Sequence, residues 1–443
     1  MSARPPLVMV PQYFGSTVFD RRTSRYLPFD HEATALLRES VTRPFPERIA
    51  DERAPAHRDT LASFFEHFQS AGFFTFDDRF AGAVLDVPHV PTDHLVGPLA
   101  LHLEVVAACN LACAHCFAGE LPRKERPLTL DEIDALFATL ARMGTFRIGL
   151  TGGEPLLRKD LFTIIDLALA HGLCPCVTTN ALLVDERVAR EFGKRELAWL
   201  NVSLDGATAE TNDRVRGAGT FDRVREKLAL LGRHTRFTLA FTVMKHNANE
   251  AAACARLAAS VGAHTAVFRP LYPVGVAREH LDLMPTFGEY SRALDALATL
   301  GADDLDAPEV ESTEAFGPAR RSAAQAALYQ NYGCGAGNLV CSVSVSGDVN
   351  PCSFLGDDYV ADNVRHTPFD RIWHDSPRFR ELRATPDDGH GTSSFGGGCR
   401  ARSLVLAGSA HAPDPWLTAH ERAPSTHHPL VVLRTTKRGR AHA

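Results

Sequence analysis

The sequence has 443 residues, which is enough for two to four domains of about 100–200 residues each. Hydrophobic residues make up 45% of the chain and charged residues 23%, the proportions of an ordinary folded protein with a large core. The net charge of −6 argues against binding to nucleic acid through overall charge, because phosphate contacts need concentrated Lys and Arg. The chain lacks an apolar run of about 18 residues and an N-terminal secretory signal, so we expect a cytoplasmic protein that does not cross a membrane.

Residues 1–95 are predicted to form a small separate unit. Residues 16–20 and 25–29 flank a polar turn and indicate a β-hairpin. A helix is expected to begin after Asp30, which has the side chain of an N-cap, and a second helix is expected over residues 59–70. A linker rich in proline follows this unit.

Strand and helix patterns alternate from about residue 99 to residue 273, and we assign residues 99–300 to one core domain. Strands are expected at residues 100–106, 147–150, 174–178, 198–204, 237–244 and 266–269. Helices are expected between them, at residues 129–143, 160–171, 185–194, 221–233 and 249–260. Six such repeats predict an α/β fold with a parallel sheet, closed or partly closed like a (β/α)6 barrel. In such folds the functional residues follow the C-terminal ends of the strands.

The C-terminal third has a different composition. Residues 301–332 are predicted to form an acidic connector and a helix, and residues 416–443 a poorly ordered tail. Residues 333–415 are rich in Gly and Cys and have little apolar periodicity, so we expect a metal to stabilise them. The chain has ten cysteines and no export signal, which favours metal ligands or catalytic thiols over disulfides.

Three cysteines lie on one short loop directly after the first strand of the core, at Cys109, Cys113 and Cys116. Three thiolates can bind three irons of a [4Fe–4S] cluster and leave the fourth iron open to a small molecule. The alternatives are a zinc site, which normally takes four ligands, or three structural thiols. The spacing CxxxCxxC with an aromatic residue next, here Phe117, resembles the signature of the radical S-adenosylmethionine (radical SAM) superfamily.

A glycine motif closes the second strand of the core at Gly152-Gly153-Glu154-Pro155. It resembles the GGEP motif by which this superfamily holds the amino group of the SAM methionine. Glycine lets the backbone approach a ligand closely, and a carboxylate such as Glu154 accepts hydrogen bonds from an ammonium group. The alternative is a turn at the strand end with a helix beginning at Pro155.

Further candidate SAM contacts follow the later strands. They are Thr178, Asn180, Ser203, Asp205, Arg216, Asn247 and Arg269. The resemblance places the stretch around Ser203 near the SAM ribose and carboxylate. The alternative interpretation of Asp205 is that it caps a turn. It also implies that Arg216 pairs with the SAM carboxylate, with a surface arginine in a loop as the alternative.

A second set of cysteines lies in the C-terminal third, at Cys334, Cys341, Cys352 and Cys399. A hairpin around Gly347 is expected to bring Cys341 and Cys352 together. The pattern resembles SPASM, the auxiliary-cluster module of radical SAM enzymes that modify peptides. The full module binds two further clusters, but residues 388–395 contain no cysteine, so this twitch-like version implies one fully ligated auxiliary [4Fe–4S] cluster. Zinc bound by four cysteines is the alternative.

The remaining cysteines are Cys174, Cys176 and Cys254, and we interpret them as small buried side chains. The resemblance implies that an electron donor such as flavodoxin or ferredoxin reduces the first cluster. It further implies that SAM is cleaved to methionine and a 5′-deoxyadenosyl radical, which abstracts hydrogen from the substrate. The sequence does not indicate a catalytic acid or base, so that assignment stays open.

The substrate is less well defined by the sequence. Residues 1–95 resemble the winged-helix-like peptide-binding domain (RRE/PqqD-like) of maturases that modify ribosomally made peptides. Such a domain binds a leader peptide as an added strand. The first hypothesis is therefore a precursor peptide. The second is a small molecule, oxidised or epimerised as a sugar or cofactor precursor. The third, an iron–sulfur electron carrier without catalysis, does not explain the motif at residues 152–155.

Overall fold

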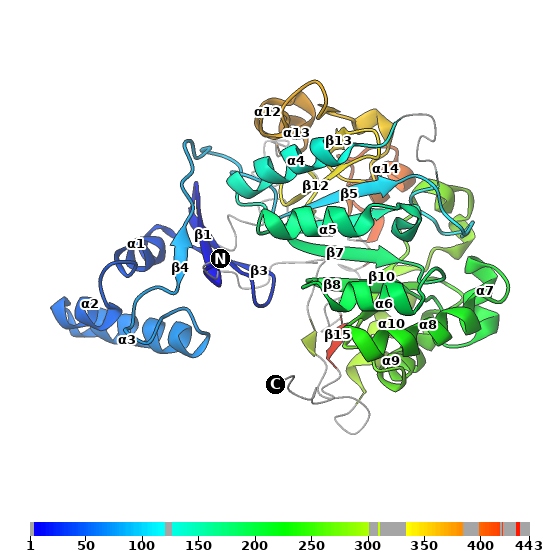
Figure 1. Ribbon diagram of the computed structural model, residues 1–443, viewed down its shortest axis with the longest axis horizontal. Helices are drawn as coiled ribbons and strands as arrows, with labels where there is room; N and C mark the ends of the chain where they lie inside the picture. The colour runs from blue at the N-terminus through cyan, green and yellow to red at the C-terminus, as the bar shows by residue number, and fades with distance from the viewer. Residues whose placement is uncertain are drawn as a thin grey trace.

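The computed structural model describes residues 4–119, 126–300, 309–310, 334–383, 398–416, 419 and 431–434. Most of the predicted connector and of the predicted tail lies outside these residues. The described residues form an N-terminal unit beside a larger α/β body (Figure 1). None of the described helices is both long enough and apolar enough to span a bilayer.

The N-terminal unit contains a sheet of four strands in the order β3-β2-β1-β4, with three helices packed on it. Its elements are β1 (Leu7–Gln12), β2 (Gly15–Asp20), β3 (Arg25–Phe29), α1 (His31–Glu39), α2 (Phe45–Asp51), α3 (Pro55–Ser70) and β4 (Gly82–Val84). The predicted hairpin is confirmed as the antiparallel pair of β2 and β3. Asp30 caps α1 as predicted, because its Oδ1 accepts a hydrogen bond of 2.9 Å from the backbone N of Ala33. The strands β1 and β4 and the helix α2 were not predicted.

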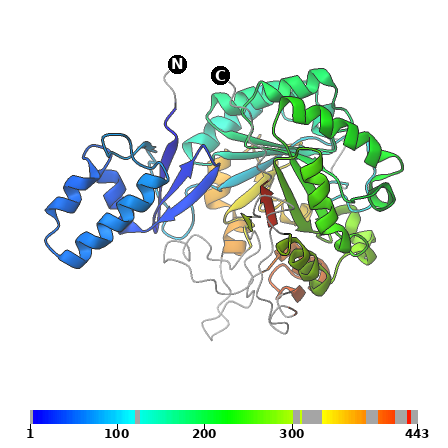
Figure 2. The same cartoon turned by 90° about the horizontal axis from the view of Figure 1, so that it is seen from below.

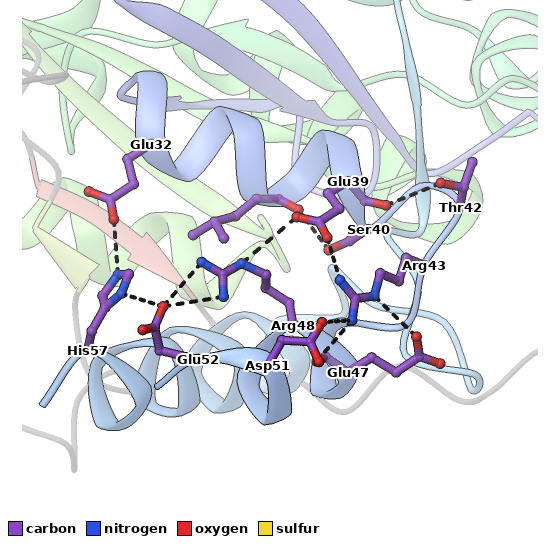
Figure 3. Close-up of polar contacts among 11 residues, drawn as sticks. Glu32, Glu39, Ser40, Thr42, Arg43, Glu47, Arg48, Asp51, Glu52 and His57 are labelled. Atoms are coloured by element: carbon purple, nitrogen blue, oxygen red, sulfur yellow. Dashed lines mark hydrogen bonds and ion pairs between the residues drawn. The ribbon is translucent and has the colours of Figure 1, made fainter. Parts of the chain in front are cut away.

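Charged side chains join the three helices of this unit (Figure 3). Arg43, which follows α1, pairs with Glu39 at 2.9 Å, with Glu47 at 3.2 Å and with Asp51 at 2.5 Å. Exposed ion pairs contribute little to stability, because water screens the charges. The apolar core of the unit, which is dominated by phenylalanine, therefore stabilises it more than this network does.

The core domain contains six parallel strands that are adjacent in chain order. They are β5 (Ala100–Val106), β6 (Arg147–Gly152), β7 (Cys174–Thr179), β8 (Trp199–Ser203), β9 (Thr238–Val243) and β10 (Thr265–Pro270). The intervening elements are α4 (Leu130–Arg142), η1 (Pro155–Leu157), α5 (Leu161–Ala170), α6 (Glu186–Gly193), α7 (Ala209–Arg216), α8 (Thr220–His234), η2 (Ala248–Glu250) and α9 (Ala251–Ser260). Figure 2 shows helices along the outer side of this sheet. The predicted parallel α/β arrangement is thus confirmed.

Short elements extend the large sheet at both edges. After β10 come η3 (Gly275–Glu279), η4 (Leu281–Leu283), α10 (Phe287–Ala298), β11 (Glu309–Val310), β12 (Val340–Val343), β13 (Asp348–Asn350), η5 (Asp357–Tyr359), β14 (Asp362–Asn363), α12 (Phe369–Asp375), α13 (Pro377–Arg383), α14 (Arg400–Ala407) and β15 (Val431–Arg434). The strand β12 pairs in parallel with β5, with Cys341 opposite Leu101. The second set of cysteines is therefore attached to the strand that precedes the three-cysteine loop.

The N-terminal unit contacts the core domain where β6 and β7 begin. The ring of Phe19 stacks on Phe146 with centroids 5.0 Å apart. The Oη of Tyr26 donates to the carbonyl of Gly144 at 2.9 Å and accepts from the backbone N of Phe146 at 2.7 Å. These contacts lie at the N-terminal ends of the parallel strands. The three-cysteine loop lies at the opposite end, because it follows the C-terminal end of β5.

Candidate functional site

The three-cysteine loop is fixed by backbone hydrogen bonds to two other parts of the core. The backbone N of Ala114 donates to the carbonyl of Val215 at 3.0 Å, and the N of Val276 donates to the carbonyl of Cys116 at 2.9 Å. Gly275 has φ +57°, and a Cβ on it would lie 2.4 Å from the carbonyl oxygen of Phe117. Only glycine therefore lets the segment after β10 pack this closely on the loop.

The thiols of the loop lie within electrostatic range of one another. Burial raises the pKa of Cys113 to about 11, the Arg216 guanidinium opposes this, and the Cys116 and Cys109 sulfurs add to the rise. Among the described residues no three His, Cys, Asp or Glu side chains converge on one metal ion. A [4Fe–4S] cluster instead takes each cysteine on a separate iron, so this donor set fits a cluster.

His115 lies between two of the cysteines in the sequence, but its side chain pairs with a group outside the loop. Its Nε2 lies 2.9 Å from Oδ2 of Asp205, at the end of β8. The loop therefore presents its three thiols to a ligand, whereas the His115 imidazole pairs with Asp205. The sequence placed Asp205 near the site but did not predict this contact.

The glycine motif is joined directly to the start of the loop. The backbone N of Gly153 donates to the carbonyl of Val106 at 2.7 Å, and the N of Glu154 donates to that of Ala108 at 2.9 Å. A Cβ on Gly152 or Gly153 would lie 2.2 Å from one of these carbonyl oxygens. The two glycines are therefore required for the close approach of the motif and the cysteine loop.

Glu154 connects this motif to the end of β7. Its side chain is 1% exposed, and it accepts hydrogen bonds from Oγ1 of Thr179 and from the backbone N of Asn180, both at 2.7 Å. Burial raises the pKa of the Glu154 carboxyl, and these hydrogen bonds oppose the rise. Asn180 in turn donates through Nδ2 to Oδ1 of Asn110 at 2.7 Å. Glu154 thus fixes Asn180 against the cysteine loop, and its predicted contact with an ammonium group stays a prediction.

A buried ion pair joins the end of α7 to the residues that follow β8. Nε of Arg216 donates to Oδ2 of Asp205 at 2.5 Å, and the backbone N of Thr242 donates to Oδ1 at 2.7 Å. Burial alone would raise the pKa of Asp205, but Arg216 and His115 outweigh it and hold that pKa well below its usual range. The alternative of a surface arginine in a loop is wrong, because Arg216 is buried at the end of α7.

The remaining predicted contacts have different surroundings. Asn247 is fully buried and donates to the carbonyls of Asp205 at 3.0 Å and Thr242 at 2.9 Å, so it ties the ends of β8 and β9 together. Thr178 accepts a long contact of 3.4 Å from Asn201. In the described part of the chain, no hydrogen bond joins Ser203 or Arg269 to the groups around Glu154 or Asp205. Sequence reasoning missed Asn110 and Thr179 as members of the site, although each is adjacent to a predicted residue.

Three of the four cysteines of the second set pack together beside the first set. Cys334, Cys352 and Cys399 pack in one apolar cluster that also includes Phe117, whose ring contacts Phe354 at 5.4 Å between centroids. Cys341 lies on β12, and the Cys352 sulfur is among the groups that raise its pKa after burial. The hairpin of β12 and β13, with Ser342 opposite Asn350, brings Cys341 and Cys352 together as predicted. Among the described residues these thiols do not converge on one metal ion, so they suit an iron–sulfur cluster better than zinc.

Asp414 is fully buried beside the last cysteine of the second set. Its Oδ2 accepts a hydrogen bond of 2.7 Å from the backbone N of Cys399, and its Oδ1 accepts one of 2.8 Å from Nε of Arg402. Both side chains of this ion pair are fully buried. The pair positions Cys399 through its backbone.

Two family comparisons match the two cysteine sets. Residues 103–258 match the radical SAM superfamily, and residues 334–399 match SPASM, an iron-sulfur cluster-binding domain. Mycofactocin maturase MftC from Mycobacterium ulcerans is 33% identical over 333 residues, which cover 72% of this chain and 88% of the relative. An AdoMet-dependent heme synthase from Methanosarcina barkeri is 30% identical over 341 residues, covering 72% of this chain and 96% of that enzyme.

Solved structures share the fold over nearly the whole chain. Two crystal structures of Streptococcus suis SuiB, one bound to the precursor peptide SuiA and one to S-adenosylmethionine, have TM-scores of 0.68 and 0.69. Their sequence identities are 14% and 16%. They cover 93% and 94% of this chain, and 98% and 99% of SuiB.

Proposed function

Because this chain belongs to the radical SAM superfamily, we propose that it modifies a precursor peptide made on the ribosome. It is an enzyme that uses SAM and [4Fe–4S] clusters. The single observation that carries the peptide substrate is the 33% identity to a mycofactocin maturase over 333 residues. The SuiB fold, which extends over the N-terminal unit as well, supports the same proposal.

The proposal assigns a role to each residue of the site. Cys109, Cys113 and Cys116 hold the SAM-binding cluster. When bound, the cluster and SAM together supply a one-electron cleavage that gives a 5′-deoxyadenosyl radical for hydrogen abstraction. Gly152 and Gly153 bring the backbone of β6 against the loop, with φ +121° at Gly152. Glu154 orients Asn180 beside Asn110.

The other predicted SAM contacts remain part of this proposal. They are Phe117, Pro155, Thr178, Ser203, Asp205, Arg216, Asn247 and Arg269. The guanidinium of Arg216 pairs with Asp205, and the preceding residue, Val215, accepts a backbone hydrogen bond from Ala114 of the cysteine loop. The proposal also includes one auxiliary cluster on Cys334, Cys341, Cys352 and Cys399, and an electron donor such as flavodoxin or ferredoxin.

Two finer features of the fold belong to the proposal. We infer that β5 to β10 form a partial (β/α)6 barrel around the substrate. We also infer that residues 1–95 form a winged-helix-like domain that binds a leader peptide. The outer edge of β3 supports this, because β3 pairs with β2 alone in the described sheet. Pro28 lacks a backbone N–H, so an added strand would gain fewer hydrogen bonds at that position.

The peptide proposal is tested with the full chain under anaerobic conditions. The protein is mixed with SAM, a reductant and the short peptide encoded beside its gene, and peptide mass and 5′-deoxyadenosine are both measured. We expect a mass change in the peptide, and none with a variant in which all three loop cysteines are Ala. Continued SAM cleavage with an unchanged peptide would contradict the peptide substrate. Equal affinity for the peptide with and without its N-terminal leader would contradict the role of residues 1–95.

A small-molecule substrate is the second candidate, and the 30% identity to an AdoMet-dependent heme synthase favours it. This alternative predicts turnover without any peptide. It does not explain the N-terminal unit, whose ordered contacts with Gly144 and Phe146 fix it against the core.

A further inference from the structure

The sheet of the N-terminal unit buries apolar side chains on both of its faces. On β1, Leu7 and Met9 pack into the apolar core of the unit itself. Val8 and Val10 alternate with them and pack into the core of the larger α/β body. A Cβ on Gly144 of the core domain would lie 2.6 Å from Cγ1 of Val10, so the two parts approach each other closely. Because two apolar cores share the sheet, the unit cannot move freely against the core domain.

Two arginines of the unit add polar contacts to the end of the core helix α5. Nη1 of Arg4 donates to the carbonyl of Leu169 at 2.6 Å, and its Nη2 donates to the carbonyl of Ala170. Nη1 of Arg21 donates to the carbonyl of Gly172. Cations are favourable at the C-terminal end of a helix, where carbonyl oxygens point outward. These contacts fix the orientation of the unit as well as its position.

The unit is held where strands of the parallel sheet begin. Gly144 precedes β6 and Gly172 precedes β7, whereas the three-cysteine loop follows the C-terminal end of β5. Figure 1 shows the N-terminal unit on the side from which the arrows of β5 and β7 point away. The strand β6 has 6 residues, which at about 3.3 Å per residue span roughly 20 Å. The N-terminal unit and the three-cysteine loop are therefore separated by about the length of this strand.

We propose that this separation sets a length requirement on the substrate: a precursor peptide is modified only when at least about six residues separate its leader segment from the modified residue. An extended chain spans at most about 3.3–3.6 Å per residue, so a shorter spacer does not cover roughly 20 Å. The requirement rests on the proposed binding of the leader peptide by residues 1–95. Tyr26 lies on β3, whose outer edge is the proposed leader site, and its Oη contacts Gly144 and Phe146 just before β6 begins. A leader on this edge is therefore bound at the end of the sheet remote from the three-cysteine loop.

The length of the spacer should affect modification of the peptide but not its binding. The leader contacts the N-terminal unit, so a peptide with a short spacer binds as tightly as one with a long spacer. Its modifiable residue nevertheless stays too far from the three-cysteine loop for hydrogen abstraction. A leader site that could swing toward the loop would instead accept short and long spacers alike.

The experiment uses the full anaerobic chain with SAM, a reductant and the peptide encoded beside its gene. The leader segment is first defined as the shortest N-terminal piece that retains the affinity of the whole peptide. Peptides with spacers of two, four, eight and twelve residues are then compared for their dissociation constants and for the rate of mass change. We expect similar dissociation constants, and modification at least about tenfold slower with the two-residue spacer than with the twelve-residue spacer. Ten residues added before the leader, as a matched control, should not restore the rate, and equal rates with the shortest and longest spacers would overturn the inference.

A second measurement does not depend on turnover. Each peptide carries a photoreactive benzophenone in place of the modified residue, and the cross-linked positions of the protein are mapped by mass spectrometry. We expect the two-residue spacer to give cross-links to residues 1–95 and the twelve-residue spacer to reach the three-cysteine loop. Cross-links from the two-residue spacer to that loop would overturn the inference. If affinity does not depend on the leader, or if no peptide is modified, the proposed function fails instead, which distinguishes the two failures.

Discussion

The stability of the protein should depend on pH through a buried carboxyl group, Glu104 on β5. This side chain is 6% exposed, and its Oε2 has no hydrogen-bond partner among the described residues. Burial raises the pKa of Glu104 to about 7, the nearby Asp357 adds to the rise, and the backbone of Val345 opposes it. We therefore expect Glu104→Gln to stabilise the protein at high pH, because the amide stays neutral.

The size of this effect follows from the pKa. A rise from 4.5 to about 7 corresponds to about 3 kcal/mol, at about 1.4 kcal/mol for each pKa unit. Because the folded-state pKa of Glu104 is raised, its carboxyl favours folding below about pH 4.5. That contribution is lost as the pH rises to about 7, and the loss is complete above it. The variant should therefore gain up to about 3 kcal/mol over the parent at pH 8 and little at pH 4.5.

The assay is chemical denaturation of the anaerobic holoenzyme at pH 4.5, 6 and 8, with the unfolding free energies of parent and variant compared at each pH. Glu210→Gln is the control, because that residue is exposed on α7 and such changes usually stay within about 0.5 kcal/mol. If the unfolding free energies of the parent and of Glu104→Gln changed by the same amount between pH 4.5 and pH 8, the reasoning would be refuted.

Two other predictions test the geometry around the cysteine loop. In Gly153→Ala the new Cβ would lie 2.2 Å from the Ala108 carbonyl oxygen, so iron analysis should show loss of the SAM-binding cluster. Gly232→Ala on α8, whose nearest neighbours lie at 3.6 Å, should retain iron and gain up to about 1 kcal/mol. A full iron content in Gly153→Ala would count against the close approach. Arg216→Met leaves Asp205 buried without its guanidinium and should cost about 3–5 kcal/mol in unfolding free energy, and adding Asp205→Asn should restore part of it. A variant as stable as the parent would show that the ion pair does not stabilise the fold.

The strands and the cysteine sets were predictable because their signals are local. The strand Ala100–Val106 was predicted with the observed bounds, since its apolar run ends directly at the cysteine loop. The helix α7 was missed because its residues are mostly polar, although Thr208 caps it by accepting a hydrogen bond of 3.3 Å from Thr211 N.

The contacts that define the site were less predictable. The hydrogen bond from Asn180 to Asn110 joins residues 70 positions apart, and it depends on how the end of β7 lies against the loop. The ion pair between Arg216 and Asp205 likewise depends on how the end of α7 lies against the end of β8. A sequence pattern gives the residue types of such a site, whereas only packing gives their partners.

The most direct test of the account is the EPR spectrum of the reduced, anaerobic protein with and without SAM. The account predicts a cluster signal that SAM perturbs, and it predicts that replacing Cys109, Cys113 and Cys116 with Ala removes this signal while the auxiliary signal remains. A spectrum that SAM leaves unchanged would contradict the central claim that the loop keeps one iron open.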